Sequence, residues 1–168
     1  MNRHPASIPP DGRHRYAVRV YYEDTDAGGV AYHASYLRFA ERARTEALRD
    51  MGIPHADLLQ CFTLMFVVRR VEVDYLRPAR LDDSLIVVTE SRAVGGASVL
   101  LRQEVRGPEG ACAVLTVRLA CVKPGESKPG RLPQRWRTVL TALCQAATGQ
   151  AARGTDGRAP EDRDGDRG

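Results

Sequence analysis

Apolar residues recur along the chain in two different rhythms, one typical of strands and one typical of a helix. Between residues 16 and 22, aromatic and β-branched residues alternate with others, which predicts a strand. From residue 33 to residue 51, apolar residues recur every three or four positions, which predicts one long helix with a single apolar stripe. This stripe comprises Tyr36, Leu37, Ala40, Ala43, Ala47, Leu48 and Met51.

The opposite face of this predicted helix is charged. It carries Arg38, Glu41, Arg42, Arg44, Glu46 and Arg49. The alanines at the centre of the apolar stripe would let a sheet pack close to the helix axis. Gly52 suits a left-handed cap at the end of the helix, and Pro54 prevents its continuation.

Beyond residue 62 the chain has the pattern of strands separated by turns. We predict strands at 62–76, 84–93, 97–105 and 111–122, followed by a shorter helix at 132–147. The pair Gly95-Gly96 is a hairpin signal, and a second turn falls at 107–110. One long helix followed by a run of strands favours an α+β fold, in which an antiparallel sheet carries the helix on one face.

Length and composition fit one globular domain. The chain has 168 residues, of which 43% are hydrophobic and 27% charged, and both values are ordinary. We predict that the domain covers residues 15–147. A flexible polar tail at 1–14 precedes it, and a tail at 148–168, poor in large apolar residues, is expected to be disordered.

Several classes of function are made improbable by the composition. No apolar run approaches the ~20 residues of a membrane span, and the first residues lack the apolar core of a secretory signal, so we expect a cytoplasmic protein. The four cysteines are widely spaced, which is typical of reduced thiols. The net charge of +4 comes from 23 arginines and 2 lysines scattered along the chain, without the basic block expected for nucleic-acid binding.

The densest chemistry lies in the stretch YYEDTDAGGVAYHASY, residues 21–36, between the first strand and the long helix. It holds the carboxylates Glu23, Asp24 and Asp26, together with two glycines and His33. Helix N-termini carry unpaired N–H groups and partial positive charge. Carboxylates beside such donors could attack and polarise a carbonyl group.

The run from Val20 to His33 resembles the signature of hot-dog-fold acyl-CoA thioesterases, the 4-hydroxybenzoyl-CoA thioesterase-like family, and especially its YbgC-type, Tol-Pal-associated branch. The segments YLRFAERARTEALR and RPARLDD are similar to that branch as well, so the resemblance extends over about residues 16–133. It implies the hot-dog fold, an antiparallel sheet wrapped around one long central helix. It also implies hydrolysis of acyl-CoA to a free acid and CoA, without cofactor or metal.

The resemblance also assigns roles to individual residues. Asp26 would act on the thioester, either as nucleophile or as general base for water. The backbone N–H of Tyr32 would polarise the thioester oxygen, and His33 would orient water or the thioester. Substrate-binding positions would be Gly28 and Gly29 in the loop, with Arg77, Arg80 and Arg92 as candidates for the CoA phosphates.

Other carboxylates of the chain are expected to have lesser roles. Adjacent residues point to different sides, so Glu23 and Asp24 are predicted to be structural or solvent-facing. Glu41 is the alternative catalytic carboxylate, since related folds use one on the helix. The spacing of Asp24, Asp26 and His33 fits no metal-ligand motif, and the chain lacks the G-x-S-x-G elbow of serine hydrolases.

For partners, the resemblance implies an acyl-CoA substrate, with acyl carrier protein as an alternative carrier, and a homodimer or homotetramer with the site at a subunit interface. It also allows a peripheral position at the inner membrane. A second hypothesis is a non-catalytic scaffold that binds acyl groups and is linked to the Tol-Pal cell-envelope system. A third, an acyl-group dehydratase on the same fold, matches the motif less well.

Overall fold

The computed structural model describes residues 9–126 and 128–153 as three helices, one short 3-10 turn and five strands. The strands are β1 Arg13–Arg19, β2 Met65–Tyr75, β3 Ser84–Val94, β4 Ser98–Gly107 and β5 Gly110–Val122. The helices are α1 His33–Asp50, α2 His55–Phe62 and α3 Gln134–Arg153, and the 3-10 turn η1 covers Tyr22–Asp24.

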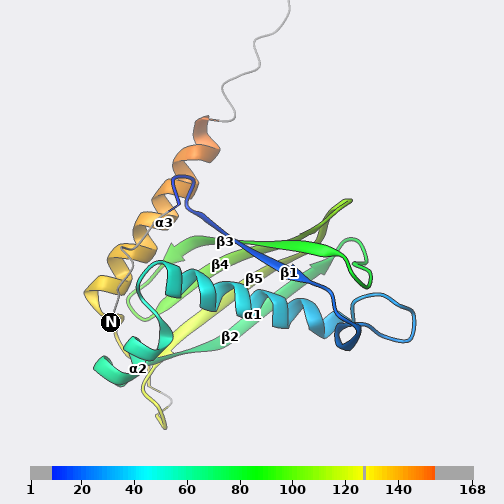
Figure 1. Cartoon of the computed structure of the whole chain (residues 1–168). Coiled ribbons are helices and arrows are strands. Elements are labelled where there is room, and N and C mark those ends of the chain that lie inside the picture. The colour runs from blue at the N-terminus through cyan, green and yellow to red at the C-terminus, as the bar shows by residue number, and fades with distance from the viewer. Residues whose placement is uncertain (1–8, 127, 154–168) are drawn as a thin grey trace, which may run out of the picture.

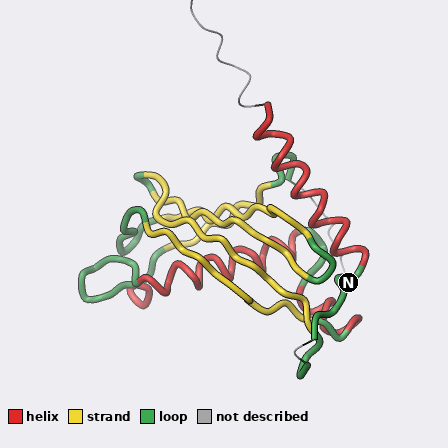
Figure 2. The backbone as a smooth tube through the Cα atoms, turned by 180° about the vertical axis from the view of Figure 1, so that it is seen from behind, coloured by secondary structure: helices red, strands yellow, loops and turns green. Residues whose placement is uncertain are grey.

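The strands form one antiparallel sheet in the order β1-β3-β4-β5-β2, and α1 lies across one of its faces (Figure 1). Seen from behind, the sheet curves in front of this helix (Figure 2). The predicted α+β arrangement, an antiparallel sheet around one long helix, is therefore confirmed. The two predicted turns join β3 to β4 and β4 to β5, as the sequence pattern indicated.

The core lies between α1 and the inner face of the sheet. Most of the predicted apolar stripe of α1 is buried, including the alanines Ala40, Ala43 and Ala47. Their small side chains let α1 approach the sheet closely, and large side chains from the strands fill the remaining space. The sheet contributes Leu85, Val87, Val99, Leu101, Val105, Leu115, Val117 and Leu119.

Two residues of α1 differ from the predicted pattern. Phe39 was not part of the predicted stripe, yet it is completely buried, which widens the apolar face of the helix. Arg44 was predicted on the charged face, but its aliphatic stem lies toward the core, and its guanidinium donates to Oε1 of the buried Gln103 at 3.3 Å. Burial lowers the pKa of Arg44. Long basic side chains can place their stems on apolar surface in this way.

Several element boundaries also differ from the predictions. The helix α2 was not predicted, because eight residues are too few for a clear period. It ends at Phe62, where Thr63 adopts a left-handed conformation, so β2 starts later than expected. β1 begins at Arg13, inside the predicted N-terminal tail, and α3 continues past the predicted end at residue 147. The remaining tail predictions, for 1–8 and 154–168, lie outside the described residues.

The helix α3 closes the end of the core where α1 finishes (Figure 1). Trp136 of α3 is only 2% exposed and packs edge-on against Phe62 of α2, with ring centroids 5.4 Å apart. Gly12 lets the start of β1 touch α3. A side chain at Gly12 would meet the Leu143 carbonyl oxygen at 2.4 Å and the Ala147 nitrogen at 2.5 Å.

The strand β2 forms one edge of the sheet and pairs only with β5 among the described residues. Its exposed apolar side chains include Val68, Val71 and Tyr75. An exposed edge strand of this length with apolar side chains is a surface suited to pairing with another chain. Among the described helices, none is long and apolar enough to cross a membrane.

Candidate active site

The loop before α1 is fastened to the helix through Asp24. This residue is only 1% exposed, and its carboxylate accepts the Tyr21 N–H at 3.1 Å and lies 3.5 Å from the Arg38 guanidinium. Its backbone carbonyl accepts the Ser35 hydroxyl at 2.8 Å and the Tyr32 N–H at 2.7 Å. Asp24 therefore has a structural position, as predicted, and it holds the entrance of α1 in place.

Asp26 lies just beyond this anchor, in a tight turn exposed to solvent. Thr25 and Ala31 form an antiparallel bridge, and the Asp26 N–H donates to the Val30 carbonyl at 3.0 Å. One carboxylate oxygen of Asp26, Oδ1, accepts the Gly28 N–H at 2.8 Å. Within the described chain no hydrogen-bond donor is recorded for Oδ2, so one oxygen of the carboxylate is oriented by the turn and the other faces solvent.

The two glycines of this loop have different local roles. Gly29 has a φ of 72°, in the left-handed region that favours glycine, and its N–H closes the turn on the Asp26 carbonyl at 3.0 Å. Gly28 supplies the N–H that holds the carboxylate. Together they let the chain reverse within a few residues. The loop between β1 and α1, which contains Asp26, lies at the end of the molecule where α1 begins (Figure 1).

The N-terminus of α1 presents backbone donors, but not the one that the resemblance implied. The Tyr32 N–H is already used by the Asp24 carbonyl, which corrects its assignment to the thioester oxygen. The next two donors, the N–H groups of His33 and Ala34, have no recorded acceptor among the described residues. They occupy the first turn of the helix, where N–H groups lack intrahelical partners.

Aromatic side chains surround this helix end. The His33 ring lies 4.2 Å from the Tyr32 ring, and Tyr75 meets it edge-on at 6.4 Å. The Tyr75 hydroxyl donates to the His33 carbonyl at 3.0 Å, which ties β2 to the start of α1. Tyr36, in the next turn of α1, packs edge-on against Tyr75 and is buried. Its hydroxyl accepts the Ala79 N–H at 2.9 Å, and burial raises the pKa of Tyr36.

The three arginines proposed for CoA phosphates do not lie together. Arg80 forms an isolated bridge with Val30, beside the Asp26 turn, and Arg77 precedes it on the same segment. Arg92 lies eight positions along β3 from Ser84, roughly 26 Å away at about 3.3 Å per residue. Its guanidinium is paired with Glu90. Arg77 and Arg80 thus remain near the loop, whereas Arg92 does not.

The alternative carboxylate and the metal question can be followed in the same structure. Glu41 is exposed about two turns into α1, where it accepts the Thr45 hydroxyl at 2.9 Å. Within the described part of the chain, no three His, Cys, Asp or Glu side chains are arranged to hold a metal ion. The catalytic candidates that the structure brings to one end are therefore Asp26, His33 and the helix N-terminus.

Sequence reasoning missed the residues that hold the site. Arg38 was counted only as part of a charged face, and Ser35 was not singled out. The Arg38 guanidinium donates to the Ser35 hydroxyl at 2.8 Å and lies beside the Asp24 carboxylate, which completes the anchor. The available signal was weak: Ser35 and Arg38 are three positions apart and so share one face of the helix.

The fold and this loop define the class of protein. The model of the thioesterase superfamily matches residues 28–114, slightly more than half of the chain. The chain therefore belongs to the thioesterase superfamily, and its fold is the hot-dog fold of that family's solved structures.

Individual relatives narrow the likeness further. The chain is 47% identical over 133 residues to the acyl-CoA thioesterase YbgC of Haemophilus influenzae, covering 79% of this chain and 98% of that protein. A probable thioesterase from Bartonella henselae superposes with a TM-score of 0.68 at 39% identity, covering 72% of this chain and 99% of that one. A Thermus thermophilus thioesterase, solved with coenzyme A and zinc, has a TM-score of 0.66 at 30% identity, covering 78% and 94%.

Proposed function

We propose that this protein hydrolyses acyl-CoA thioesters to a free acid and CoA, at the loop around Asp26. The observation that carries the proposal is the exposed Asp26 carboxylate, which the Gly28 N–H orients in the loop that leads into the N-terminus of α1. Membership in the thioesterase superfamily supports it, as does the 47% identity to a relative called an acyl-CoA thioesterase.

In the proposed reaction, the thioester carbonyl lies between Asp26 and the first turn of α1. The Asp26 carboxylate either removes a proton from the water that attacks the carbonyl carbon, or attacks that carbon itself. In the second case, loss of CoA leaves an anhydride between the acyl group and Asp26, and a water molecule must hydrolyse this anhydride to release the acid and restore the carboxylate. Negative charge then develops on the carbonyl oxygen, where the N–H groups of His33 and Ala34 and the helix dipole stabilise it. The C–S bond breaks, the thiolate of CoA takes up a proton, and the acid is released.

His33 and Tyr75 are proposed to border the reacting group. The His33 side chain is exposed and has no recorded hydrogen bond within the described chain, so its ring nitrogens can contact water or the thioester. The Tyr75 hydroxyl holds the His33 backbone. We assign His33 an orienting role in the site.

The phosphates of CoA are proposed to contact Arg77 and Arg80. Both side chains are exposed on the segment that pairs with the catalytic loop, and guanidinium groups match phosphate oxygens well. The phosphopantetheine arm of an acyl carrier protein offers the same thioester, so such a carrier is an alternative substrate. We leave Arg92 out of this contact because it lies at the far end of β3.

We propose further that the protein works as a homodimer in which two copies pair their β2 edges. Val68, Val71 and Tyr75 are exposed on this strand, and pairing would cover them. Tyr75 touches the start of α1, so a partner at β2 would border the catalytic loop. A tetramer would require a second surface. Size-exclusion chromatography with light scattering tests the dimer, and a charged residue at Val71 should weaken it.

The non-catalytic alternative is a scaffold that holds acyl groups for the Tol-Pal system without hydrolysing them. It would use the same loop and the same helix end, in the cytoplasm or at the surface of the inner membrane. Turnover separates the two proposals, because a scaffold binds acyl-CoA without releasing free thiol.

Free-thiol release from a panel of short, long and aromatic acyl-CoAs tests the proposed reaction. Asp26→Asn should lower kcat for the best substrate by about 10²-fold or more, as expected for a principal catalytic carboxylate. Glu23→Gln, an exposed carboxylate of the same loop, is the matched control and should retain activity. Absence of thiol release from every substrate would overturn the proposal, and activity retained in Asp26→Asn would move the search to His33 and Glu41.

A further inference from the structure

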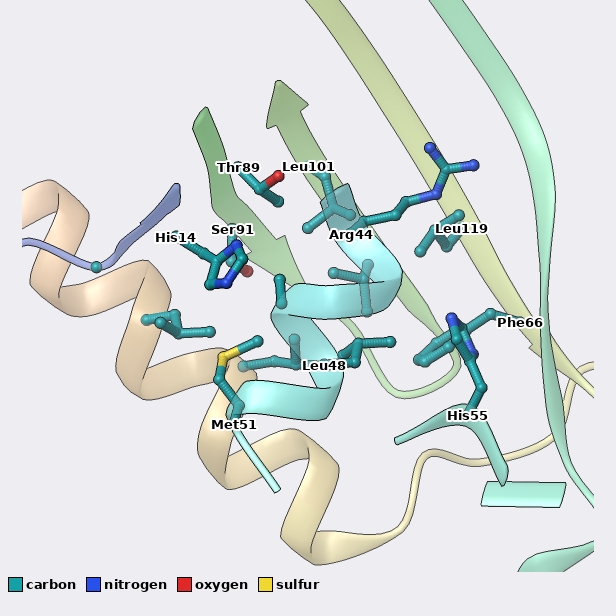
Figure 3. Close-up of a pocket in the computed structure, with 15 residues that line it drawn as sticks. His14, Arg44, Leu48, Met51, His55, Phe66, Thr89, Ser91, Leu101 and Leu119 are labelled. Carbon is teal, nitrogen blue, oxygen red and sulfur yellow. The ribbon is translucent and has the colours of Figure 1, made fainter. Parts of the chain in front are cut away.

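A second candidate site lies at the other end of α1, beneath α3 (Figure 3). It is a pocket between α1, α3 and the inner face of the sheet, and it opens to solvent on one side. Most of its wall is hydrocarbon. The apolar lining includes Leu48, Met51, Leu101, Leu119, Leu140 and Leu143.

Two polar groups of this pocket have no partner among the described residues. The Ser91 hydroxyl and Nδ1 of His14 are both buried without a hydrogen bond. Ser91 is only 3% exposed. Leaving such groups unpaired in an apolar site is costly, so each calls for a ligand atom or a trapped water.

The sheet register brings these two groups together. His14 on β1 is paired with Thr89 on β3, and Ser91 follows Thr89 on the same face of β3. His14 and Ser91 are therefore diagonal neighbours on two paired strands, a position at which residues of adjacent strands are about 7–8 Å apart. Nε2 of His14 lies 2.9 Å from an Asp50 carboxylate oxygen, so this nitrogen is already occupied, and Nδ1 is the ring nitrogen left without a partner among the described residues.

We propose that this pocket binds a linear carboxylic acid, with its hydrocarbon chain along the leucines and its carboxyl group on Ser91 and His14. A carboxyl group fits this pair in either state of the ring. Neutral His14, protonated at Nε2 toward Asp50, accepts the O–H of an undissociated acid at Nδ1, whereas the imidazolium donates Nδ1–H to a carboxylate. The Ser91 hydroxyl donates to the second oxygen.

The pocket is separate from the proposed catalytic loop of the same chain. Its α1 residues centre on Ala47, which is 14 positions after His33, or about 21 Å along a helix with a rise of roughly 1.5 Å per residue. Arg44 also lines the pocket, but its guanidinium contacts Gln103. The proposal does not require hydrolytic activity, since a free acid carries no thioester.

Calorimetric titration with sodium decanoate tests the site directly. We expect saturable binding of one decanoate per chain, with the same affinity in wild type and in Asp26→Asn. Ser91→Ala should weaken this binding about tenfold, the size expected for a buried hydrogen bond to a charged group. Ser84→Ala, an exposed serine on the same strand, is the matched control and should bind decanoate as wild type does.

A second readout separates ligand binding from a structural role of Ser91. If its hydroxyl serves a ligand, removing it from the ligand-free protein relieves an unpaired buried group, so Tm should stay the same or rise. A fall in Tm with unchanged decanoate affinity would mean that a trapped water satisfies the hydroxyl, and would overturn the proposal. Absence of saturable binding would also overturn it, as would competitive displacement of decanoate by decanoyl-CoA in Asp26→Asn.

Discussion

The two ends of α1 have opposite surroundings: its start is polar and exposed, and its finish is apolar and enclosed. At its start, the chain is exposed, rich in carboxylates and held by hydrogen bonds that converge on Asp24. At its finish, the helix is enclosed by α2, α3 and the sheet, and the contacts are largely apolar. Polar, exposed segments are where proteins can place reactive groups, whereas close-packed apolar ends resist change. We infer that the start of α1 holds the proposed chemistry, whereas its finish combines the apolar packing that stabilises the fold with the proposed acid-binding pocket.

Two glycines, one near each end of α1, test how tightly the two ends are packed. Gly12 and Gly29 have similar left-handed φ values, 65° and 72°. A Cβ at Gly12 meets α3 backbone atoms at 2.4 and 2.5 Å, whereas a Cβ at Gly29 meets nothing within 4 Å. Gly12→Ala should therefore lower the free energy of unfolding by about 3 kcal/mol or more, through conformational strain and steric overlap.

Gly29→Ala is the matched control for that experiment. It should lower the free energy of unfolding by about 1–2 kcal/mol, from backbone conformation alone. Urea unfolding followed by circular dichroism measures both variants. Equal losses in the two variants would contradict the claim that the α3 end is the more tightly packed.

The anchor at the start of α1 gives the next largest effect. Asp24→Asn removes the charge that faces Arg38 and adds an amide donor without a partner. We expect a loss of about 1–2 kcal/mol in the free energy of unfolding. We also expect kcat/KM to fall about tenfold, because the loop that carries Asp26 is no longer fastened to the start of α1 through Asp24.

Thiol release and urea unfolding of the same samples measure these two effects of Asp24→Asn. Arg38→Gln should have a smaller effect on stability, since the Arg38 side chain is 55% exposed and its ion pair is screened by water. Unchanged kcat/KM in Asp24→Asn would show that the anchor does not position the proposed catalytic carboxylate, Asp26.

The smallest effect concerns pH at the apolar end. Burial lowers the pKa of His55 below its ordinary value of 6.5, because the charged ring is desolvated beside Phe66. A group with a lowered folded-state pKa binds protons more readily in the unfolded chain. Its contribution to stability is therefore complete above about pH 6.5 and is lost as the pH falls through the lowered value.

His55→Gln should remove this part of the pH dependence. The ring keeps some contact with solvent, so the effect should be small. The difference in the free energy of unfolding between wild type and His55→Gln should change by less than about 1 kcal/mol from pH 7.5 to pH 5. Urea unfolding at several pH values measures this difference. Parallel pH curves for the two proteins would mean that His55 makes no such contribution.

The same contrast explains what could be predicted from the sequence. The long helix and the strands were predictable because each has a sustained period of apolar residues. The short helix α2 has no such length, and it was missed. The burial of Phe39 and Arg44 depends on how far the sheet curves around α1, which no local pattern records.

For the site, the sequence placed Asp26, the two glycines and His33 in one loop, and the structure keeps them at one end of the molecule. The sequence could not show that the Tyr32 N–H donates to the Asp24 carbonyl, because this bond depends on how the loop after η1 folds back toward the start of α1. Nor could it show that Arg92 lies far from Arg80, since β3 carries the chain away from Arg80 along its whole length. Local motifs thus predicted which groups are present, and long-range contacts decided which are free.

The packing of Trp136 against Phe62 has a spectroscopic consequence. The chain contains a single tryptophan, and its indole is enclosed at the α3 end, away from the proposed catalytic loop. Indole emission moves to longer wavelength on contact with water, so the fluorescence of this protein reports when α3 separates from α2. Emission follows one end of α1, whereas circular dichroism follows the whole backbone. Coincident unfolding curves would make the two chemically opposite ends one cooperative unit.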